Sequence, residues 1–424
     1  MRVAQIKQLL PIYDVFYEPR WCVPGKATLP PIEIAGTKVG VLICEDMWDE
    51  EYPIHPGADL KKMGAEMLIC ISASPYRRGA GQGRLRHAGR QVSTGSTTVP
   101  LVFVNLVGAN DELIFDGNSF ILNGDGVGEL AKFEEEVRVI DSNTKDTKYT
   151  KEEPKEEEEI FNALVLGLRD FARKNGLRRA FIGLSGGIDS SVAAVIAAEA
   201  LGKECVTGVA IPSRFTDPRS TESARELAES LGIGFEIVEL GSLHKQAELT
   251  LGKLLEGGST AENIQARLRM MILMSYVNRY GGFLINTSNK TELTLGYSTL
   301  YGDMAGAISP LGDLTKPEVY ALARWINQKD EGGRVKDERR KRKDSAGVIP
   351  SFVMEREPSA ELRENQVDPF DYEKISPEME ALVRNNQGNA AMRQSEHKRW
   401  QMGLVLKVSD KSFGRGRLMP ITRR

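Results

Sequence analysis

Residues Ser185-Gly-Gly-Ile-Asp-Ser-Ser191 decide the fold of the second half of this chain. An apolar run, Arg179-Ala-Phe-Ile-Gly-Leu184, precedes them, and an alanine-rich segment, 192–200, follows them. This order predicts a strand, a tight glycine turn and the start of a helix. Glycine lets the backbone approach an anion closely, and the first amides of a helix are unpaired donors at the positive end of its dipole. The turn is therefore expected to hold phosphate.

The same stretch excludes one common site and leaves one alternative open. The chain contains no Gly-x-x-x-x-Gly-Lys-Ser/Thr, so the turn is not the common nucleotide-binding loop. An ordinary glycine-rich turn, with Asp189 as a helix cap, would have a similar composition. We favour a phosphate site because the whole stretch lies between an apolar run and an alanine-rich segment.

The rest of the second half alternates short apolar runs with amphipathic segments. Strands are expected at 205–211, 235–240 and 283–286, and helices at 220–231 and 264–280. A further helix is expected around Phe161 to Phe171, ending near Asn175-Gly176. This alternation predicts an α/β fold, with a parallel sheet covered on both faces and its ligand at the carboxyl ends of the strands.

The composition is that of an ordinary soluble globular protein. The length of 424 residues suggests two or three domains, and 41% of the residues are hydrophobic and 27% charged. A formal net charge of −3 does not indicate nucleic acid or a membrane surface, and no apolar stretch is long enough to cross a bilayer. The cysteines, at 22, 44, 70 and 205, indicate neither a disulfide framework nor a zinc site. We expect a cytoplasmic protein without nucleic-acid or membrane partners.

A charged stretch at 142–159 separates two parts of different character and is expected to be a linker. It divides a domain at 1–141 from a domain at 160–424. A second charged run, 329–344, could be a nucleic-acid patch, but we interpret it as a loop because acidic residues are interspersed.

The first domain has apolar runs at 39–43, 67–71 and 101–105, which predict buried strands. Another strand is expected at Val3-Ala-Gln-Ile-Lys7, with almost nothing before it. A domain that opens inside a sheet is expected to have lost its beginning.

Polar groups gather at the expected ligand edge of the second domain. Asp189 and Glu292 are expected to share an oxygen-coordinated Mg²⁺ with the bound phosphates, and Lys316 to neutralise charge on a departing phosphate group. Each group alone could equally be a surface cap or a salt-bridge partner. As a set beside a phosphate loop they favour a functional site.

Several motifs follow one another along the second domain. They are 185–190, Asn263-Ile-Gln-Ala-Arg-Leu-Arg269, Thr287-Ser-Asn-Lys-Thr-Glu292, Tyr301-Gly-Asp303, Pro358-Ser-Ala-Glu-Leu362, His397-Lys-Arg-Trp-Gln401 and the tail Ser412-Phe-Gly-Arg-Gly-Arg-Leu-Met-Pro420. Together they resemble the NAD synthetases, which are N-type ATP pyrophosphatases with an adenine-nucleotide α-hydrolase-like, doubly wound sheet. The resemblance covers residues 160–424. It implies that ATP adenylates the carboxylate of deamido-NAD and that ammonia then displaces AMP to give NAD.

The resemblance also implies roles for individual residues. The ATP-binding set is Gly183, Leu184, Ser185, Gly186, Gly187, Ile188, Asp189, Ser190, Ser191, Thr287 and Lys316. Asp189 and Glu292 match magnesium ligands. The contacts to deamido-NAD are Asn263, Glu292, Asp303 and Lys398, with Asp303 and Lys316 near the reacting phosphates.

The first domain carries motifs of another kind: Lys7-Gln-Leu-Leu-Pro-Ile-Tyr-Asp-Val-Phe16, Val41-Leu-Ile-Cys-Glu-Asp-Met-Trp48 and Leu113-Ile-Phe-Asp-Gly117. A thiolate at a strand-to-helix turn can attack an amide, and a nearby ammonium can lower the thiol pKa and hold the oxyanion. The motifs resemble the glutaminase domain of glutamine-dependent NAD synthetases, which has the α-β-β-α nitrilase fold. The resemblance implies Cys44 as nucleophile, Lys7 as the stabilising lysine, and Tyr13 and Ser74 as glutamine contacts. Alternatively, Cys44 is a small buried core residue.

Two features depart from the glutaminase pattern. The family's general-base glutamate precedes the lysine on an early strand, whereas Lys7 is here the seventh residue. Ala80 also stands where many members carry a basic residue. Either the N-terminus is incomplete or the glutaminase has decayed on a working synthetase.

The expected partners are therefore deamido-NAD, ATP and glutamine or ammonia, in a homo-oligomer. One alternative is another N-type ATP pyrophosphatase, such as a GMP or asparagine synthetase or a tRNA-thiolating enzyme. Another is that residues 1–141 are only a structural module for oligomer contacts.

We expect the chain to form NAD from ammonium and to use glutamine poorly. A thiol near its ordinary pKa is only a few per cent thiolate at neutral pH. A missing general base typically costs roughly 10²–10⁴ in rate. The measurement is steady-state NAD formation with saturating ammonium and with saturating glutamine. Equal rates with the two donors, with the glutamine rate alone abolished by Cys44→Ala, would contradict this expectation.

Overall fold

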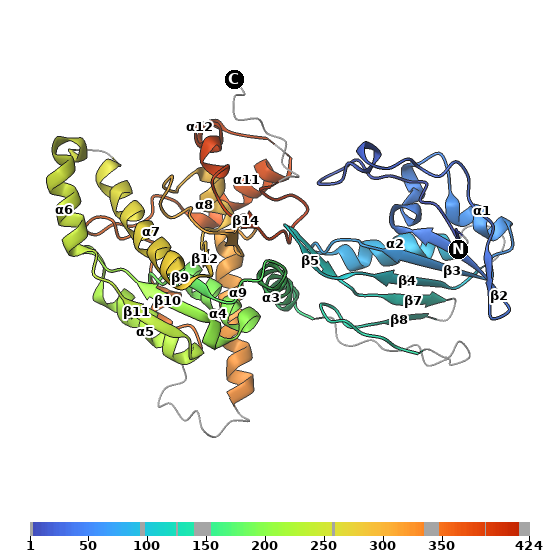
Figure 1. Ribbon diagram of the computed structural model, residues 1–424, viewed down its shortest axis with the longest axis horizontal. Helices are drawn as coiled ribbons and strands as arrows, with labels where there is room; N and C mark the ends of the chain where they lie inside the picture. The colour runs from blue at the N-terminus through green and yellow to red at the C-terminus, as the bar shows by residue number, and fades with distance from the viewer. Residues whose placement is uncertain are drawn as a thin grey trace. The chain divides into compact units, whose positions relative to one another are not determined.

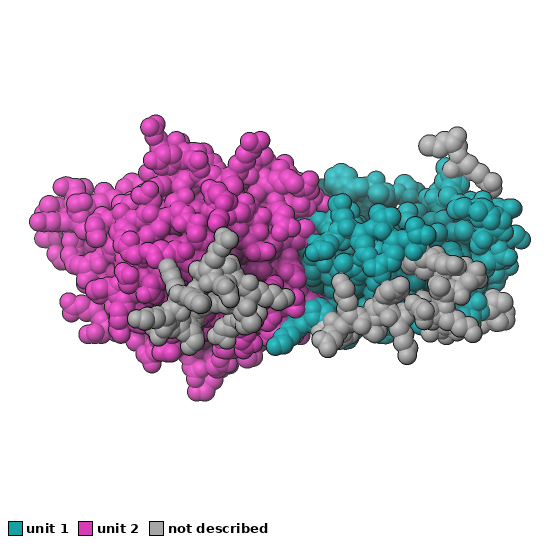
Figure 2. Space-filling view, turned by 90° about the horizontal axis from the view of Figure 1, so that it is seen from below, with its two compact units in different colours: residues 1–109, 113–155 teal, residues 110–112, 156–424 magenta. Residues whose placement is uncertain are grey.

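The computed structural model describes residues 3–93, 98–123, 126–139, 154–256, 259–334, 347–385 and 387–414. The chain divides into two compact units, residues 1–109 with 113–155 and residues 110–112 with 156–424 (Figure 2). Three features of the sequence fall outside the described residues. They are most of the expected linker (142–153), most of the second charged run (335–344) and the tail at 415–420.

The second unit is built on a six-stranded sheet in the order β11-β10-β9-β12-β13-β14 (Figure 1). Its strands are β9 (Ala180–Gly183), β10 (Val206–Ala210), β11 (Gly234–Ile237), β12 (Phe283–Ile285), β13 (Ile308–Ser309) and β14 (Leu404–Val405). Every pairing is parallel. The expected strands and the doubly wound α/β class are confirmed.

The order of the strands places the functional edge beside β9. The chain runs from β9 outward to β10 and β11 and then returns to β12 on the other side of β9. Because crossovers between parallel strands are right-handed, the helix between β9 and β10 and the long helix of the returning crossover from β11 to β12 lie on opposite faces of the sheet. The carboxyl ends of β9 and β12 therefore diverge into loops at a topological switch point, where ligands bind in such sheets.

Ten helices are described in this unit: α3 (Glu156–Lys174), α4 (Ile188–Leu201), α5 (Pro218–Leu231), α6 (Gly241–Leu251), α7 (Thr260–Tyr280), α8 (Lys290–Leu295), α9 (Lys316–Arg334), α10 (Ser351–Glu355), α11 (Tyr372–Arg384) and α12 (Ala390–Arg399). Helices α3 and α9 pack on α4, and α7 contacts β9 and β12. Helix α3 begins at Glu156, inside the stretch assigned to the linker, and its first turn consists of glutamates. Their charge is favourable at the positive end of the helix dipole.

Helix α4 is central to this packing. Val192, Ala193, Ala194, Ile196 and Ala197 have no solvent exposure. Small side chains allow α3, α9 and the sheet to approach α4 closely from several sides. The alanine-rich segment after the phosphate loop is therefore a buried helix, which fixes the position of the loop.

The short helix α8 is anchored by a buried ion cluster. The Lys290 ammonium lies 2.9 Å from Oδ1 of Asp313 and 2.5 Å from Oε2 of Glu380, and the side chains of Lys290 and Asp313 have no solvent exposure. Asp313 also accepts hydrogen bonds of 2.7 Å from the amides of Val408 and Ser409. This cluster connects α8 with α11 and with the segment after β14.

The first unit has a second six-stranded sheet, in the order β1-β2-β3-β4-β7-β8. Its strands are β1 (Ile32–Ile34), β2 (Thr37–Ile43), β3 (Met67–Ser72), β4 (Leu101–Asn105), β7 (Phe120–Asn123) and β8 (Gly126–Glu129). The buried strands expected in this domain are present as β2, β3 and β4, which are parallel, and the outer strands are antiparallel. Helices α1 (Pro56–Lys62) and α2 (Ala80–Ser93) and a separate ribbon of β5 (Val107–Asn110) and β6 (Leu113–Asp116) complete the unit.

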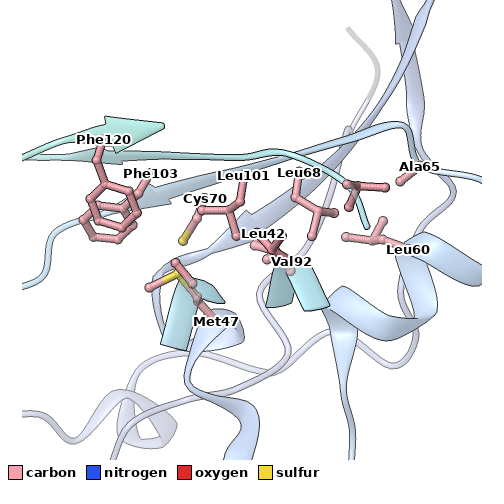
Figure 3. Close-up of a cluster of buried hydrophobic side chains, with 12 residues drawn as sticks. Leu42, Met47, Leu60, Ala65, Leu68, Cys70, Val92, Leu101, Phe103 and Phe120 are labelled. Carbon is pink, nitrogen blue, oxygen red and sulfur yellow. The ribbon is translucent and has the colours of Figure 1, made fainter. Parts of the chain in front are cut away.

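One buried cluster connects the sheet with the helices of this unit (Figure 3). Leu42, Leu68 and Phe103 come from β2, β3 and β4, and none of them is exposed. The rings of Phe103 and Phe120 stack at a centroid distance of 5.0 Å. Met47 enters the same cluster from the short turn after β2.

The strand expected at Val3–Lys7 is absent, because residues 3–12 have no strand pairing. The amides that follow it, of Gln8 and Leu9, donate to Oδ1 of Asp46 at 3.0 and 2.9 Å. The carbonyl of Lys7 accepts from the amide of Gly25 at 2.8 Å. A side chain and a loop thus satisfy this backbone, so a sheet ladder is not needed. The apolar residues at 3–7 did not distinguish a strand in a sheet from a segment that a side chain and a loop hold in place.

Within the described residues, no helix is long and apolar enough to span a membrane.

Replacing Lys290 with Met should destabilise the second unit strongly. Removing one partner of a buried ion pair leaves the other charge uncompensated and typically costs about 3–5 kcal/mol. The matched control is Lys374→Met, whose ion pair with Asp371 is exposed and should contribute at most about 1 kcal/mol. Urea denaturation measures both unfolding free energies. Similar small losses in the two variants would contradict a stabilising role for the cluster.

Candidate functional site

The phosphate loop joins β9 to α4 in the conformation that its glycines predict. Gly186 has φ +76°, and a Cβ there would lie 2.1 Å from the carbonyl oxygen of Ser220. Gly187 is the N-cap of α4, and no side chain caps the helix. The hydroxyls of Ser190 and Ser191 donate back to the Gly187 carbonyl at 3.0 and 2.9 Å. The first amides of α4 are therefore available to an anion.

The loop forms one wall of a cavity of about 320 Å³. Of the predicted ATP-binding residues, those lining it are Gly183, Leu184, Ser185, Gly187, Ile188, Asp189, Ser190, Thr287 and Lys316. Gly186 and Ser191 are not among the lining residues. These two residues stabilise the conformation of the loop instead. Gly186 approaches Ser220 closely, and the hydroxyl of Ser191 donates to the carbonyl of Gly187.

Three charged groups from three helices meet in this cavity. The Lys316 ammonium, at the start of α9, lies 2.5 Å from Oδ2 of Asp189 on α4. It lies 3.1 Å from Oε1 of Glu292 on α8. The structure thus brings together all three groups that the sequence placed at the ligand edge.

The charges of these three groups influence one another's pKa values. Burial opposes the charged form of Lys316, but Asp189 and Glu292 outweigh it, so the pKa of Lys316 is raised. Burial raises the pKa of Glu292 to about 7, reinforced by Asp189 and opposed by Lys316. The cavity therefore contains an ammonium that its carboxylate neighbours keep charged and a carboxyl whose pKa is raised by burial.

The donor set fits a hard divalent cation shared with a ligand. Asp189 and Glu292 converge on a single positive group, and carboxylate oxygens are the ligands that Mg²⁺ prefers. Across the described residues no group of three or more His, Cys, Asp or Glu could hold a metal alone. Phosphate and water oxygens would have to supply the remaining ligands.

A loop between α8 and β13 forms another part of the site. Asp303 lines the cavity and accepts a 2.8 Å hydrogen bond from the amide of Thr299. Burial among protein groups raises the pKa of Asp303 to about 6. Asn263 and Lys398 do not line this cavity. Asn263 accepts from the hydroxyl of Thr299 at 2.8 Å.

Lys398 holds the same loop close to the contact made by Asn263. Its ammonium donates to the carbonyls of Gly296 and Ser298 at 2.9 and 2.6 Å. Burial lowers the pKa of Lys398, although Asp303 opposes this effect. The four residues predicted to contact deamido-NAD thus fall into two groups. Glu292 and Asp303 line the cavity, and Asn263 and Lys398 hold the loop that carries Asp303.

In the first unit, Cys44 begins a short 3₁₀ turn, Cys44–Met47, directly after β2. Its φ of +48° is a strained conformation for a residue other than glycine. Met47 is buried in the core and fixes the turn. Cys44 is only partly buried, so it is not simply one more core residue. Backbone strain of this kind is typical of functional positions.

The other predicted glutaminase residues have defined partners. The Lys7 ammonium lies 2.6 Å from Oε2 of Glu18. The Tyr13 hydroxyl donates to Oε2 of Glu45 at 2.8 Å. Burial raises the pKa of Tyr13, and the neighbouring Glu45 and Cys44 raise it further. Tyr13 therefore lies beside the cysteine turn.

Ser74 belongs to a separate network. Its amide donates to Oδ1 of Asn105 at 2.8 Å, and its hydroxyl accepts from Nε of Arg84 at 3.2 Å. Arg84 also forms a buried, bidentate pair with Asp116 at 2.9 and 2.8 Å. Ala80, at the position where a basic residue was noted as missing, is the first residue of α2.

Three residues in these sites were not singled out from the sequence: Glu18, Asp46 and Asn289. Glu18 pairs with Lys7, and Asp46 accepts amides from the segment after Lys7. Asn289 donates to Asp189 at 2.9 Å. Asp46 lies within the motif at 41–48 and Asn289 within the motif at 287–292, and this location was the available signal. Their hydrogen-bond partners are distant in sequence, so the sequence did not indicate what they contact.

Comparisons with known proteins agree with this geometry. The family model of NAD synthase matches residues 160–412, and that of carbon-nitrogen hydrolase matches residues 8–152. A glutamine-dependent NAD(+) synthetase of Synechocystis is 36% identical over 99% of this chain and 79% of its own length. That of Rhodobacter capsulatus is 38% identical over the same shares.

A solved structure gives the same result. The glutamine-dependent NAD+ synthetase from Acinetobacter baumannii, in complex with ADP, matches 98% of this chain and 78% of its own chain. The TM-score is 0.73 and the sequence identity 31%. The expected combination of a nitrilase-like domain with a synthetase domain is confirmed.

Gly186→Ala should damage the phosphate loop. A non-glycine residue at this φ costs about 1–3 kcal/mol, and the contact with Ser220 adds to that loss. The matched control is Gly176→Ala, where φ is +67° but nothing lies within 4 Å of the added Cβ. We expect both variants to lose stability in chemical denaturation and only Gly186→Ala to lose ATP binding in calorimetric titration. Equal ATP affinities would contradict the role assigned to the loop.

Proposed function

We propose a function for this chain on the premise that it belongs to the family of glutamine-dependent NAD(+) synthetases. The protein catalyses the ATP-dependent amidation of deamido-NAD to NAD, with AMP and pyrophosphate as the other products. The nitrogen comes from glutamine or ammonia. The observation that carries this proposal is the cavity in which an uncapped helix N-terminus meets Asp189, Glu292 and Lys316.

ATP binding is assigned to the phosphate loop. The amides at the start of α4 are directed at phosphate, and Gly186 and Gly187 permit its close approach. Lys316 keeps its charge under burial, so it can stabilise the negative charge that develops as pyrophosphate leaves. We further propose that Asp189 and Glu292 hold Mg²⁺, which when bound neutralises phosphate charge.

The chemistry then depends mainly on positioning. The carboxylate of deamido-NAD attacks the α-phosphate, and the resulting acyl-adenylate is already activated toward ammonia. We assign Glu292 and Asp303 to the cavity wall that faces deamido-NAD. Asn263 and Lys398 support the loop of Asp303, and this support is how they influence the same substrate.

The glutaminase chemistry is assigned to the first unit. Cys44 is the proposed nucleophile, at a strained turn that presents its thiol. Lys7 is proposed to stabilise the oxyanion, and Tyr13 and Ser74 to contact glutamine. We take residues 1–141 as the glutaminase domain and 160–424 as the synthetase domain. Between them lies the linker at 142–159, whose last four residues belong to helix α3 of the second unit. We also propose a cytoplasmic homo-oligomer.

The alternative assignments are not favoured. A GMP or asparagine synthetase or a tRNA-thiolating enzyme would share the phosphate loop, but the family model matched by residues 160–412 is that of NAD synthase. A purely structural first unit does not explain why Cys44 occupies a strained turn beside Tyr13.

The decisive experiment is an assay of NAD formation from deamido-NAD and ATP, with ammonium as the nitrogen donor. NAD, AMP and pyrophosphate should appear in equal amounts. Formation of ADP and phosphate, or turnover without deamido-NAD, would contradict the proposal.

Asp189→Asn should remove most of the turnover with ammonium. The substitution preserves shape and removes one negative charge beside Lys316, and loss of one key electrostatic contact typically costs about 10²–10³ in kcat. Asp371→Asn is a matched control, because Asp371 is an exposed N-cap and Asn caps a helix equally well. Near wild-type NAD formation by Asp189→Asn would remove Asp189 from the site.

A further inference from the structure

Asn289 connects two of the charged groups of the cavity through one side chain. Its Nδ2 donates to Oδ1 of Asp189 at 2.9 Å. Its Oδ1 accepts from the amide of Glu292 at 3.0 Å, which makes Asn289 the N-cap of α8. One amide group therefore contacts the carboxylate of Asp189 and the backbone of Glu292.

The two partners fix the orientation of this amide. The Glu292 N–H needs an acceptor, and the Asp189 carboxylate needs a donor. Rotating the amide by half a turn would place two donors together and two acceptors together. Asn289 has no solvent exposure, so water does not replace either bond.

The arrangement also determines how Asp189 faces the cavity. Its Oδ1 is bound by Asn289, and its Oδ2 lies 2.5 Å from the Lys316 ammonium. Because each oxygen of Asp189 has its own partner, the carboxylate group is fixed in one orientation relative to Glu292. These two contacts also determine the direction of the lone pairs that remain free on the Asp189 oxygens.

We propose that Asn289 is a positioning residue for nucleotide binding, which sets the rotation of Asp189 and its distance from Glu292 so that both can share one cation with ATP phosphates. Asn289 does not touch the substrate. It acts through Asp189 by donating and through Glu292 by capping α8. The inference rests on the proposed function, and it adds a residue to which no role at this site has been assigned.

The test separates donation from capping. Serine is as good an N-cap as asparagine, so Asn289→Ser retains the cap and removes the donor to Asp189. Asn289→Asp retains the cap and the shape but replaces the donor with an acceptor. The control is Asn389→Ser, because Asn389 caps α12 by accepting from the amide of Met392 at 2.9 Å.

Two quantities are measured on the full chain. Calorimetry gives the Kd of ATP at a series of Mg²⁺ concentrations, without deamido-NAD. Steady-state kinetics with ammonium gives kcat and the KM for ATP. We expect Asn289→Ser to weaken ATP binding in Mg²⁺ and to raise the half-saturating Mg²⁺ concentration about 10- to 100-fold, the effect of one hydrogen bond to a charged group. Asn289→Asp should be worse, and Asn389→Ser should match wild type.

Each outcome supports or overturns the positioning role of Asn289. If Asn289→Ser folds and binds ATP with the Mg²⁺ dependence of wild type, Asn289 is only a helix cap and the proposal fails. Wild-type behaviour of Asn289→Asp would also overturn it. If the wild-type chain forms no NAD, the proposed function fails instead, and this result is distinct because it does not involve a variant.

Discussion

The ammonium of Lys316 is the group on which the second unit depends. It is almost fully buried, and a buried ammonium is stable only when opposite charges and hydrogen bonds compensate its lost hydration. Asp189 from α4 and Glu292 from α8 provide that compensation. Three helices that are far apart in sequence are therefore required to meet at one point. The stability of the unit and the chemistry of the cavity share this constraint.

The sheet makes that meeting possible. Because β9 lies between β10 and β12, the loops that leave β9 and β12 open at the same edge. Asp189 follows the first loop and Glu292 follows the second. Lys316 then begins α9, with its amide donating to the hydroxyl of Thr291 at 3.2 Å. Lys290, which directly precedes Thr291, anchors α8 through buried ion pairs. Within one short helix, Lys290 thus serves stability and Glu292, two residues further on, belongs to the cavity.

The sequence predicted what depends on local pattern. Apolar runs located the strands, and the glycines of 185–191 located the phosphate loop. Elements set by distant contacts were not found. Helix α8 has only six residues, and the partner of Asn289, Asp189, lies 100 residues away. The strand expected at Val3–Lys7 was wrong for the same reason, since the side chain that satisfies the following backbone belongs to Asp46.

Asp46 and Asp313 show how both units position functional segments without extending a sheet. Each carboxylate accepts neighbouring backbone amides, of Gln8 and Leu9 in one case and of Val408 and Ser409 in the other. They differ in how their charge is balanced. Asp313 lies against the ammonium of Lys290, whereas the pKa of Asp46 is raised by burial and lowered by its amide donors. Asp313 is therefore fixed by an ion pair, and the segment that carries Lys7 is fixed chiefly by hydrogen bonds. The placement of Lys7 consequently depends on Oδ1 of Asp46, because this one oxygen accepts from the amides of both Gln8 and Leu9.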